Sequence, residues 1–183
     1  MAWVDLTESE LGEYRITTAE PEDLDGWWAQ RLEQARSLGK PVTADRCLRE
    51  TYGDLEVYDV EFSGAGGDRI RGWYLRPGGV AGRRLPVVVT FPGYGLGRGL
   101  PMDHTLMPAV GFGHFVMDLR CQGPGVDDPG IAVSGITDPD TYYFTRVFLD
   151  AARAIDSVAE LPGADPELVA VSGGSQGGGL ALA

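Results

Sequence analysis

The stretch that decides the fold of this chain reads Val169-Ala-Val-Ser-Gly-Gly-Ser175-Gln-Gly-Gly-Gly-Leu180. At its centre is a Gly-x-Ser-x-Gly pentapeptide, which directly follows a short apolar run and directly precedes a helix-forming one. This context is typical of a nucleophile elbow, a strained strand-to-helix turn that exposes a serine hydroxyl at its tip. Glycines suit the turn because side chains would not fit beside the serine. The pattern therefore predicts that Ser175 is a catalytic nucleophile.

Strand and helix patterns alternate along the chain upstream of this turn. Two runs with a period of two residues are separated by glycine-rich turn chemistry and predict a β-hairpin: 55–62 and 70–75. Three further apolar runs predict parallel strands: 86–91, 114–119 and 168–171. Three segments have helical spacing: 24–38, 104–110 and 142–161. This order predicts an α/β fold, a mostly parallel sheet with an antiparallel hairpin at its N-terminal edge.

The chain is long enough, at 183 residues, for one domain with a substantial core. Residues 1–40 are expected to form an N-terminal arm and a helix, because Gly39 ends the first helical pattern. Residues 41–183 are expected to form the N-terminal part of a single α/β domain that stops shortly after the serine turn. Trp27 and Trp28 are expected to pack against the sheet as core aromatic residues.

Composition narrows the classes of partner. The formal net charge is −12, with 27 acidic against 15 basic residues, which disfavours nucleic acids and anionic membrane surfaces. The N-terminus shows no basic region followed by an apolar run, and no apolar stretch approaches the roughly 18 residues of a membrane span, so a cytoplasmic location is expected. The two cysteines, Cys47 and Cys121, suggest neither a disulfide framework nor a zinc site.

Attack by a serine requires hydrogen-bond donors for the negative charge that develops on the carbonyl oxygen of the substrate. In an elbow fold the first donor is the main-chain N–H of the residue after the serine, which is Gln176 in this chain. The second donor comes from a loop after an earlier strand, and the glycine-rich loop that follows Phe91 is the candidate. Either Tyr94 or Gly95 could donate its N–H there.

A serine hydroxyl is a weak nucleophile until a base takes its proton. The chain has two histidines, His104 and His114, and both precede Ser175, whereas the order in elbow hydrolases is serine, acid, histidine. His114 opens a predicted strand and is expected to be a core or strand-end residue. His104 begins a predicted helix and is expected at the surface. Neither histidine is therefore assigned as the base.

Arg120 and Gln122 follow a predicted strand at the end of the sheet where ligand-binding loops gather. Two interpretations of Arg120 stay open. Its guanidinium could contact the substrate, or it could tie loops together near the site by bonding several carbonyl groups at once. Asp118, at the end of the same strand, is its expected neighbour.

Several segments together carry a resemblance to a known family: the elbow around Ser175, the loop Arg120-Cys-Gln-Gly, the helical segment 140–154, the strand Ile70-Arg-Gly-Trp-Tyr74, and the N-terminal residues Asp5-Leu, Tyr14 and Trp27-Trp28. They resemble the acetyl xylan esterases and cephalosporin-C deacetylases, a branch of the α/β-hydrolases whose signature in the second segment is Arg-Gly-Gln-Gly. The match covers nearly the whole chain. It implies the α/β-hydrolase fold, a three-layer sandwich that is truncated here after the nucleophile elbow.

The resemblance implies a serine esterase that removes acetyl groups from small substrates, such as acetylated xylo-oligosaccharides or cephalosporin C, through an acyl-enzyme on Ser175. Tyr94 and Gln176 would supply the N–H groups of the oxyanion hole, Arg120 and Gln122 would shape the site, and no metal or cofactor would take part. The family commonly forms hexamers, so a homo-oligomer is expected. Its catalytic acid and histidine lie downstream of the elbow, in a portion outside these 183 residues.

Two residues depart from the family pattern. Cys121 replaces the glycine of the signature loop, and Pro92 stands where the family often has histidine. The resemblance assigns the oxyanion-hole donor to the main-chain N–H of Tyr94. Pro92 is therefore expected to affect packing and not the oxyanion hole.

Two other functions remain as alternatives. A prolyl-oligopeptidase-like serine peptidase shares a Gly-x-Ser-x-Gly-Gly elbow, but it usually carries a β-propeller, and the first ~80 residues here are too few for one at ~40–50 residues per blade. The other alternative is a non-catalytic fragment that lacks its base and acid.

Overall fold

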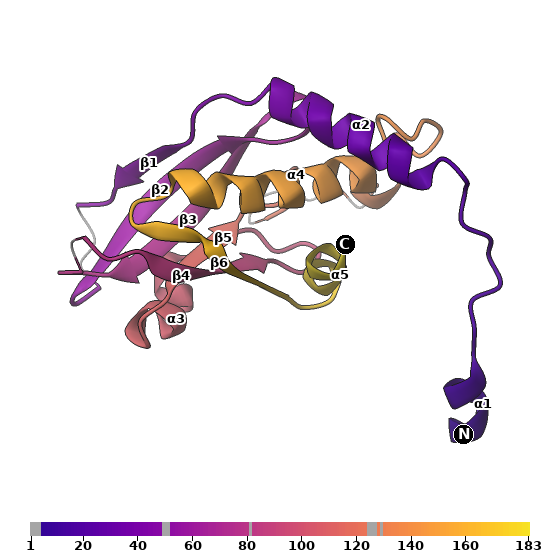
Figure 1. Cartoon of the computed structure of the whole chain (residues 1–183), viewed down its shortest axis with the longest axis horizontal. Coiled ribbons are helices and arrows are strands. Elements are labelled where there is room, and N and C mark those ends of the chain that lie inside the picture. Colours follow the sequence, from indigo (N-terminus) through magenta and orange to yellow (C-terminus); the bar gives the residue numbers. More distant parts are fainter. Residues whose placement is uncertain (1–4, 49–51, 81, 124–127, 129) are drawn as a thin grey trace.

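A mixed β-sheet forms the centre of the computed structural model, which describes residues 5–48, 52–80, 82–123, 128 and 130–183 (Figure 1). Within these ranges the sheet has six strands: β1 (Thr43–Arg46), β2 (Leu55–Ser63), β3 (Arg69–Pro77), β4 (Leu85–Phe91), β5 (Gly113–Met117) and β6 (Ala164–Gly173). Their order across the sheet is β1-β2-β3-β5-β4-β6. Since β4 lies between β5 and β6, its carboxyl end is at the centre of the parallel part of the sheet.

Strand directions confirm the predicted hairpin and parallel strands. β1, β2, β3 and β5 pair with one another in antiparallel fashion, whereas β4 is parallel to both β5 and β6. The predicted hairpin has a regular register from Leu55 opposite Pro77 to Ser63 opposite Arg69. The sequence pattern did not predict β1, because its residues Thr-Ala-Asp-Arg are mostly polar and exposed and pair with β2 only at the edge of the sheet.

Helices lie on both faces of the sheet, which gives the predicted three layers (Figure 1). They are α1 (Glu8–Glu13), α2 (Leu24–Ser37), α3 (Leu106–Ala109), α4 (Tyr143–Ser157) and α5 (Gln176–Leu182), with 3₁₀ turns η1 (Ala65–Gly67), η2 (Pro101–His104), η3 (Ile131–Val133) and η4 (Val158–Glu160). Helix α4 covers one face and α2 lies outside it, whereas α3 lies on the opposite face. In the described part of the chain, no helix is both long and apolar enough to cross a lipid bilayer.

The hydrophobic core lies between α4 and the sheet. One side of α4 is buried along its length at Tyr143, Val147, Ala151 and Ala154, which recur at helical spacing and pack with the strand residues Val89 and Phe115 of the core. Ile155 on the same helix lies outside this buried side and is exposed.

The tryptophan pair packs differently from the prediction. Trp28 makes an edge-to-face contact with Phe148 on α4, with ring centroids 6.0 Å apart, and Trp27 carries the guanidinium of Arg31 over its ring at 3.6 Å. The expectation of packing against the sheet was wrong because α4 lies between α2 and the strands. Helix α1 projects away from the body at the end of an extended arm and has no buried residue (Figure 1).

Candidate active site

Ser175 occupies the turn between β6 and α5, where the sequence places the elbow. Its backbone angles are φ 54° and ψ −123°, a left-handed region of φ that a residue with a side chain rarely adopts. Such a conformation costs on the order of 1–3 kcal/mol and persists only where the surrounding structure enforces it. The strand, strained turn and helix thus have the arrangement that a nucleophile elbow requires.

Two glycines of the pentapeptide enforce this turn by close backbone approach. A methyl group on Gly173 would clash with the carbonyl group of Gly177, and one on Gly177 would clash with the carbonyl oxygen of Phe91 at the end of β4. Gly174, by contrast, faces open space. Gly173 therefore lets the turn close on itself, and Gly177 lets the elbow lie directly against the end of β4.

The loop after β4 lies against the elbow, as the oxyanion-hole prediction requires. A Cβ atom built on Gly93 would lie 3.9 Å from Cβ of Ser175 and 3.5 Å from the carbonyl oxygen of Gly174. The N–H of Gly95 donates to Oε1 of Gln122 at 2.7 Å and is therefore already used. Among the described residues, none accepts a hydrogen bond from the main-chain N–H of Tyr94 or of Gln176. Of the two candidates in the loop, Tyr94 has the available donor.

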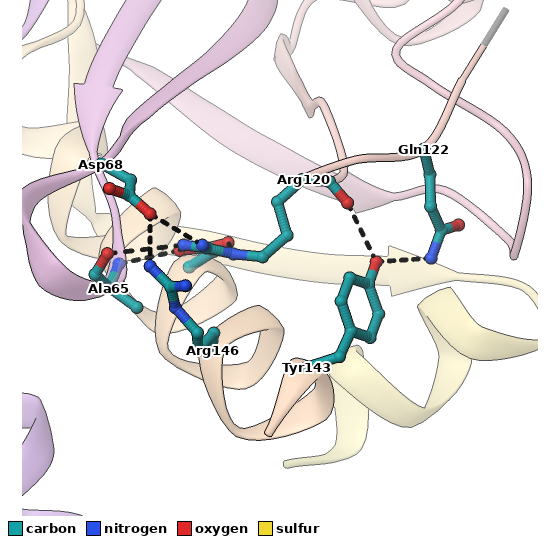
Figure 2. Close-up of polar contacts among 7 residues, drawn as sticks. Ala65, Asp68, Arg120, Gln122, Tyr143 and Arg146 are labelled. Carbon is teal, nitrogen blue, oxygen red and sulfur yellow. Dashed lines mark hydrogen bonds and ion pairs between the residues drawn. The ribbon is translucent and has the colours of Figure 1, made fainter. Parts of the chain in front are cut away.

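Gln122 joins this loop to two helices. Its amide Nε2 donates to the hydroxyl of Tyr143 on α4, which in turn donates to the carbonyl oxygen of Arg120 at 3.1 Å (Figure 2). The same Nε2 lies 3.3 Å from Oε1 of Gln176 on α5. Burial raises the pKa of the Tyr143 hydroxyl to about 12, so this group remains protonated and able to donate at neutral pH. Tyr143 had not been identified from sequence.

Arg120 ties elements together and does not extend into solvent. Its Nε and Nη2 atoms donate to the two oxygens of Asp150 at 2.6 and 2.7 Å. Its Nη1 donates to Asp68 at 2.9 Å (Figure 2). Asp150 is completely buried and also accepts the N–H of Ala65 at 2.8 Å. Burial lowers the pKa of the Arg120 guanidinium, but the hydrogen bonds and charges of Asp150 and Asp68 outweigh it and the net pKa is raised. These contacts support the second interpretation of Arg120, in which it links loops.

Asp118 pairs with a different arginine from the one expected. Its carboxylate accepts the main-chain N–H of Arg98 at 3.0 Å, and no hydrogen bond joins it to Arg120 among the described residues. The guanidinium of Arg98 stacks over Trp73 at 3.7 Å from the ring centroid and donates to the carbonyl oxygen of Gly72 at 2.8 Å. Arg98 therefore fastens the far end of the loop that carries Tyr94 to β3. Sequence spacing gave no signal for this contact.

Neither histidine is hydrogen-bonded to Ser175 in the part of the chain that the structure describes. His114 is buried, with Nδ1 3.0 Å from the carbonyl oxygen of His104 and Nε2 2.9 Å from the hydroxyl of Thr90. Because a carbonyl oxygen only accepts, Nδ1 carries the proton and Nε2 accepts from Thr90. Burial lowers the pKa of His114, which keeps the ring neutral. His104 is half-buried and donates to the carbonyl oxygen of Arg98 at 2.7 Å, so its predicted surface position was only partly right.

The two departures from the family pattern lie close to this site. Cys121 has a φ of 53°, the left-handed region that glycine adopts without strain, and its side chain is exposed. Pro92 is buried directly after β4. No group of three or more His, Cys, Asp or Glu side chains converges as a metal site among the residues with described placement.

Solved structures similar to this chain include two acetyl xylan esterases. One, from Paenibacillus sp. R4, has a TM-score of 0.87 and 33% sequence identity, and the match covers 97% of this chain and 59% of that one. The other, acetyl xylan esterase 1 from Thermoanaerobacterium sp. JW/SL YS485, has a TM-score of 0.84 and 32% identity over 98% and 59% of the two chains. These similarities confirm the predicted α/β-hydrolase type of fold.

A curated relative is the acetyl esterase Axe7A of Xylanibacter ruminicola, which is 29% identical over 179 residues. The match covers 90% of this chain and 40% of that protein, so the chain spans less than two thirds of the length of each of these relatives. The family model described as acetyl xylan esterase (AXE1) matches residues 1–183. The chain therefore belongs to the acetyl xylan esterase family.

Proposed function

We propose that the full-length protein is a serine esterase that removes acetyl groups from acetylated xylo-oligosaccharides. The observation that carries this proposal is the strained backbone of Ser175 at the β6–α5 turn, next to a loop in which the N–H of Tyr94 has no acceptor among the described residues. The names of the relatives, acetyl esterase and acetyl xylan esterase, support acetyl esters as the substrate class. Cephalosporin C is a further substrate that we propose from the family resemblance alone.

In the proposed reaction, Oγ of Ser175 attacks the acetyl carbonyl carbon while a base takes the hydroxyl proton. The N–H groups of Tyr94 and Gln176 stabilise the negative charge on the carbonyl oxygen. The bond to the sugar oxygen then breaks, the sugar leaves as an alcohol with the proton from the base, and the acetyl group stays on Ser175. Water attacks this acyl-enzyme in the same way and releases acetate, which restores the serine hydroxyl.

The base of this reaction is proposed to come from a part of the protein beyond residues 1–183. Both ring nitrogens of His114 are engaged, one by the carbonyl oxygen of His104 and the other by the hydroxyl of Thr90. Nε2 of His104 is bound to the carbonyl oxygen of Arg98. In the described part of the chain neither imidazole is hydrogen-bonded to Ser175, and the relatives extend well beyond the length of this chain.

The test compares the full-length protein with its Ser175→Ala variant on an activated acetate ester and on acetylated xylo-oligosaccharides. We expect kcat to fall by at least about 10³-fold, because the remaining rate comes only from the oxyanion hole and from binding. Rapid quenching of the wild-type reaction should show one acetyl group on Ser175 by mass spectrometry. Ser172→Ala, a serine removed from the same strand, is the control and should keep its activity. Turnover by Ser175→Ala at the wild-type rate would refute the proposal.

The same assay separates the two alternatives. A prolyl-oligopeptidase-like peptidase would cleave peptide amides faster than acetate esters, whereas the proposed esterase shows the opposite preference. A non-catalytic protein would turn over neither substrate and form no acyl-enzyme on Ser175.

A further inference from the structure

Gln122 is a buried amide that contacts both sides of the proposed oxyanion hole. Its Oε1 accepts the N–H of Gly95 at 2.7 Å, in the residue directly after Tyr94. Its Nε2 lies 3.3 Å from Oε1 of Gln176, whose main-chain N–H is the other proposed donor. Only 8% of Gln122 is exposed, so water does not readily replace these contacts. One side chain thus links the two segments whose N–H groups must converge on the carbonyl oxygen of the substrate.

The orientation of this amide is fixed by its neighbours. Gly95 presents an N–H group and needs an acceptor, so it must face Oε1. The hydroxyl of Tyr143 gives its proton to the carbonyl oxygen of Arg120, so it must accept from Nε2 (Figure 2). A rotated amide would place donor against donor and acceptor against acceptor. The site therefore requires one donor and one acceptor at this position, as glutamine supplies.

We propose that Gln122 is a positioning residue that sets the spacing between the two oxyanion-hole donors, Tyr94 and Gln176. This inference rests on the proposed function. The loop after β4 meets the elbow at Gly93, and Arg98 fastens its far end to β3. Gln122 is the contact that holds the middle of this loop, next to Tyr94, and Tyr143 anchors Gln122 in turn to α4.

Gln122→Glu is the sharpest test, because it keeps the shape of the side chain and the acceptor for Gly95 but replaces the donor to Tyr143 by a second acceptor. In the full-length protein we expect kcat on an activated acetate ester to fall about 10- to 100-fold with KM nearly unchanged, since small displacements of a catalytic donor have effects of this size. Rates are expressed per active site titrated with a covalent organophosphonate, so that misfolded protein does not count.

The pH dependence of this variant adds a readout that a purely structural role would not give. A protonated carboxyl group donates one hydrogen bond and so restores the contact with Tyr143. The ratio of variant to wild-type kcat should therefore rise as the pH is lowered. Ser157→Ala is the matched control, because it removes another buried hydrogen bond of α4, to the carbonyl oxygen of Arg153, away from the loop. It should lower the melting temperature and leave kcat unchanged.

The inference is overturned if kcat per titrated site of Gln122→Glu stays within about twofold of wild type, or if its ratio to wild type does not change with pH. Should Gln122→Glu fail to fold, Tyr143→Phe takes its place, because it removes the hydroxyl that orients the amide, and it too should lower kcat and not KM. An inactive wild type, or an active Ser175→Ala, would refute the proposed function itself and this inference with it. A normal wild type with unaffected Gln122 and Tyr143 variants would refute the inference alone.

Discussion

At the residue scale, two of the described residues other than glycine have a left-handed φ, Ser175 at 54° and Cys121 at 53°. Left-handed φ costs a residue with a Cβ atom roughly 1–2 kcal/mol. At Ser175 the strain belongs to the turn that presents the hydroxyl. Cys121 has a similar φ in a loop whose family signature has glycine, and its side chain is exposed. The two positions therefore share a left-handed φ, but only the first has a proposed chemical role.

Replacing Cys121 by glycine should stabilise the full-length protein. The change removes the left-handed strain, and the extra freedom of glycine in the unfolded chain offsets part of the gain, so we expect a net increase of about 0.5 kcal/mol in the free energy of unfolding. Urea unfolding monitored by fluorescence measures the difference. Cys121→Ala is the control, because it removes the thiol but keeps the Cβ atom, and it should bring no gain. Equal stabilisation by both variants would show that the thiol, and not the backbone, is responsible.

The turn at Ser175 could be predicted from sequence because the serine, its glycines, and the strand and helix beside it are adjacent in the chain. The sequence could not identify Asp150 or Arg98, whose partners lie far away in sequence and come together only in the folded sheet. The prediction that Asp118 neighbours Arg120 was wrong for the same reason. The two residues are close in sequence, but Arg98 approaches Asp118 from another loop.

At the scale of elements, Asp150 joins three segments that do not otherwise share a strand or helix. It projects from α4, accepts the N–H of Ala65 at the start of η1, and binds Arg120 in the loop after β5. The carboxylate has no exposed surface, so its charge is balanced inside the protein by the guanidinium. Three elements that approach the site are thereby held by one buried ion pair.

Asp150→Asn should be strongly destabilising, by about 3–5 kcal/mol, because it leaves the buried Arg120 with only the exposed carboxylate of Asp68. Asp156→Asn is the matched control. Asp156 lies on the same helix and also accepts from two arginines, but its side chain is 27% exposed, and a pair of this kind contributes about 1 kcal/mol or less. Urea unfolding measures both losses of stability, as shifts of the midpoint with an unchanged m-value. The buried pair would lose its assigned importance if the two variants were equally stable.

At the scale of the whole molecule, the order of the elements from β2 to β6 was predictable because each of these strands, and each long helix, had its own local pattern. The place of β1 at the edge was not, since four mostly polar residues carry no periodic signal and pair only because β2 is there. The division of the chain at residue 40, the oligomeric state and the cellular location stay predictions. The structure also shows which strands form the two edges of the sheet in the described part of the chain. One is β1, and the other is β6, the strand that leads to Ser175.

This edge should make the 183-residue chain, when produced alone, associate with itself. Among the described residues β6 pairs only with β4, most of its length is exposed, and Val171 near its carboxyl end is 40% exposed. An open apolar edge is a template for pairing with another chain, and a charge on it opposes such pairing. Light scattering over a concentration series should therefore show oligomers that Val171→Lys reduces. Val110→Lys is the control, because it replaces another exposed valine, at the end of α3 and away from the β6 edge. It should leave the association unchanged. A chain that remains monomeric throughout the series, or equal effects of the two lysines, would mean that the β6 edge does not drive association.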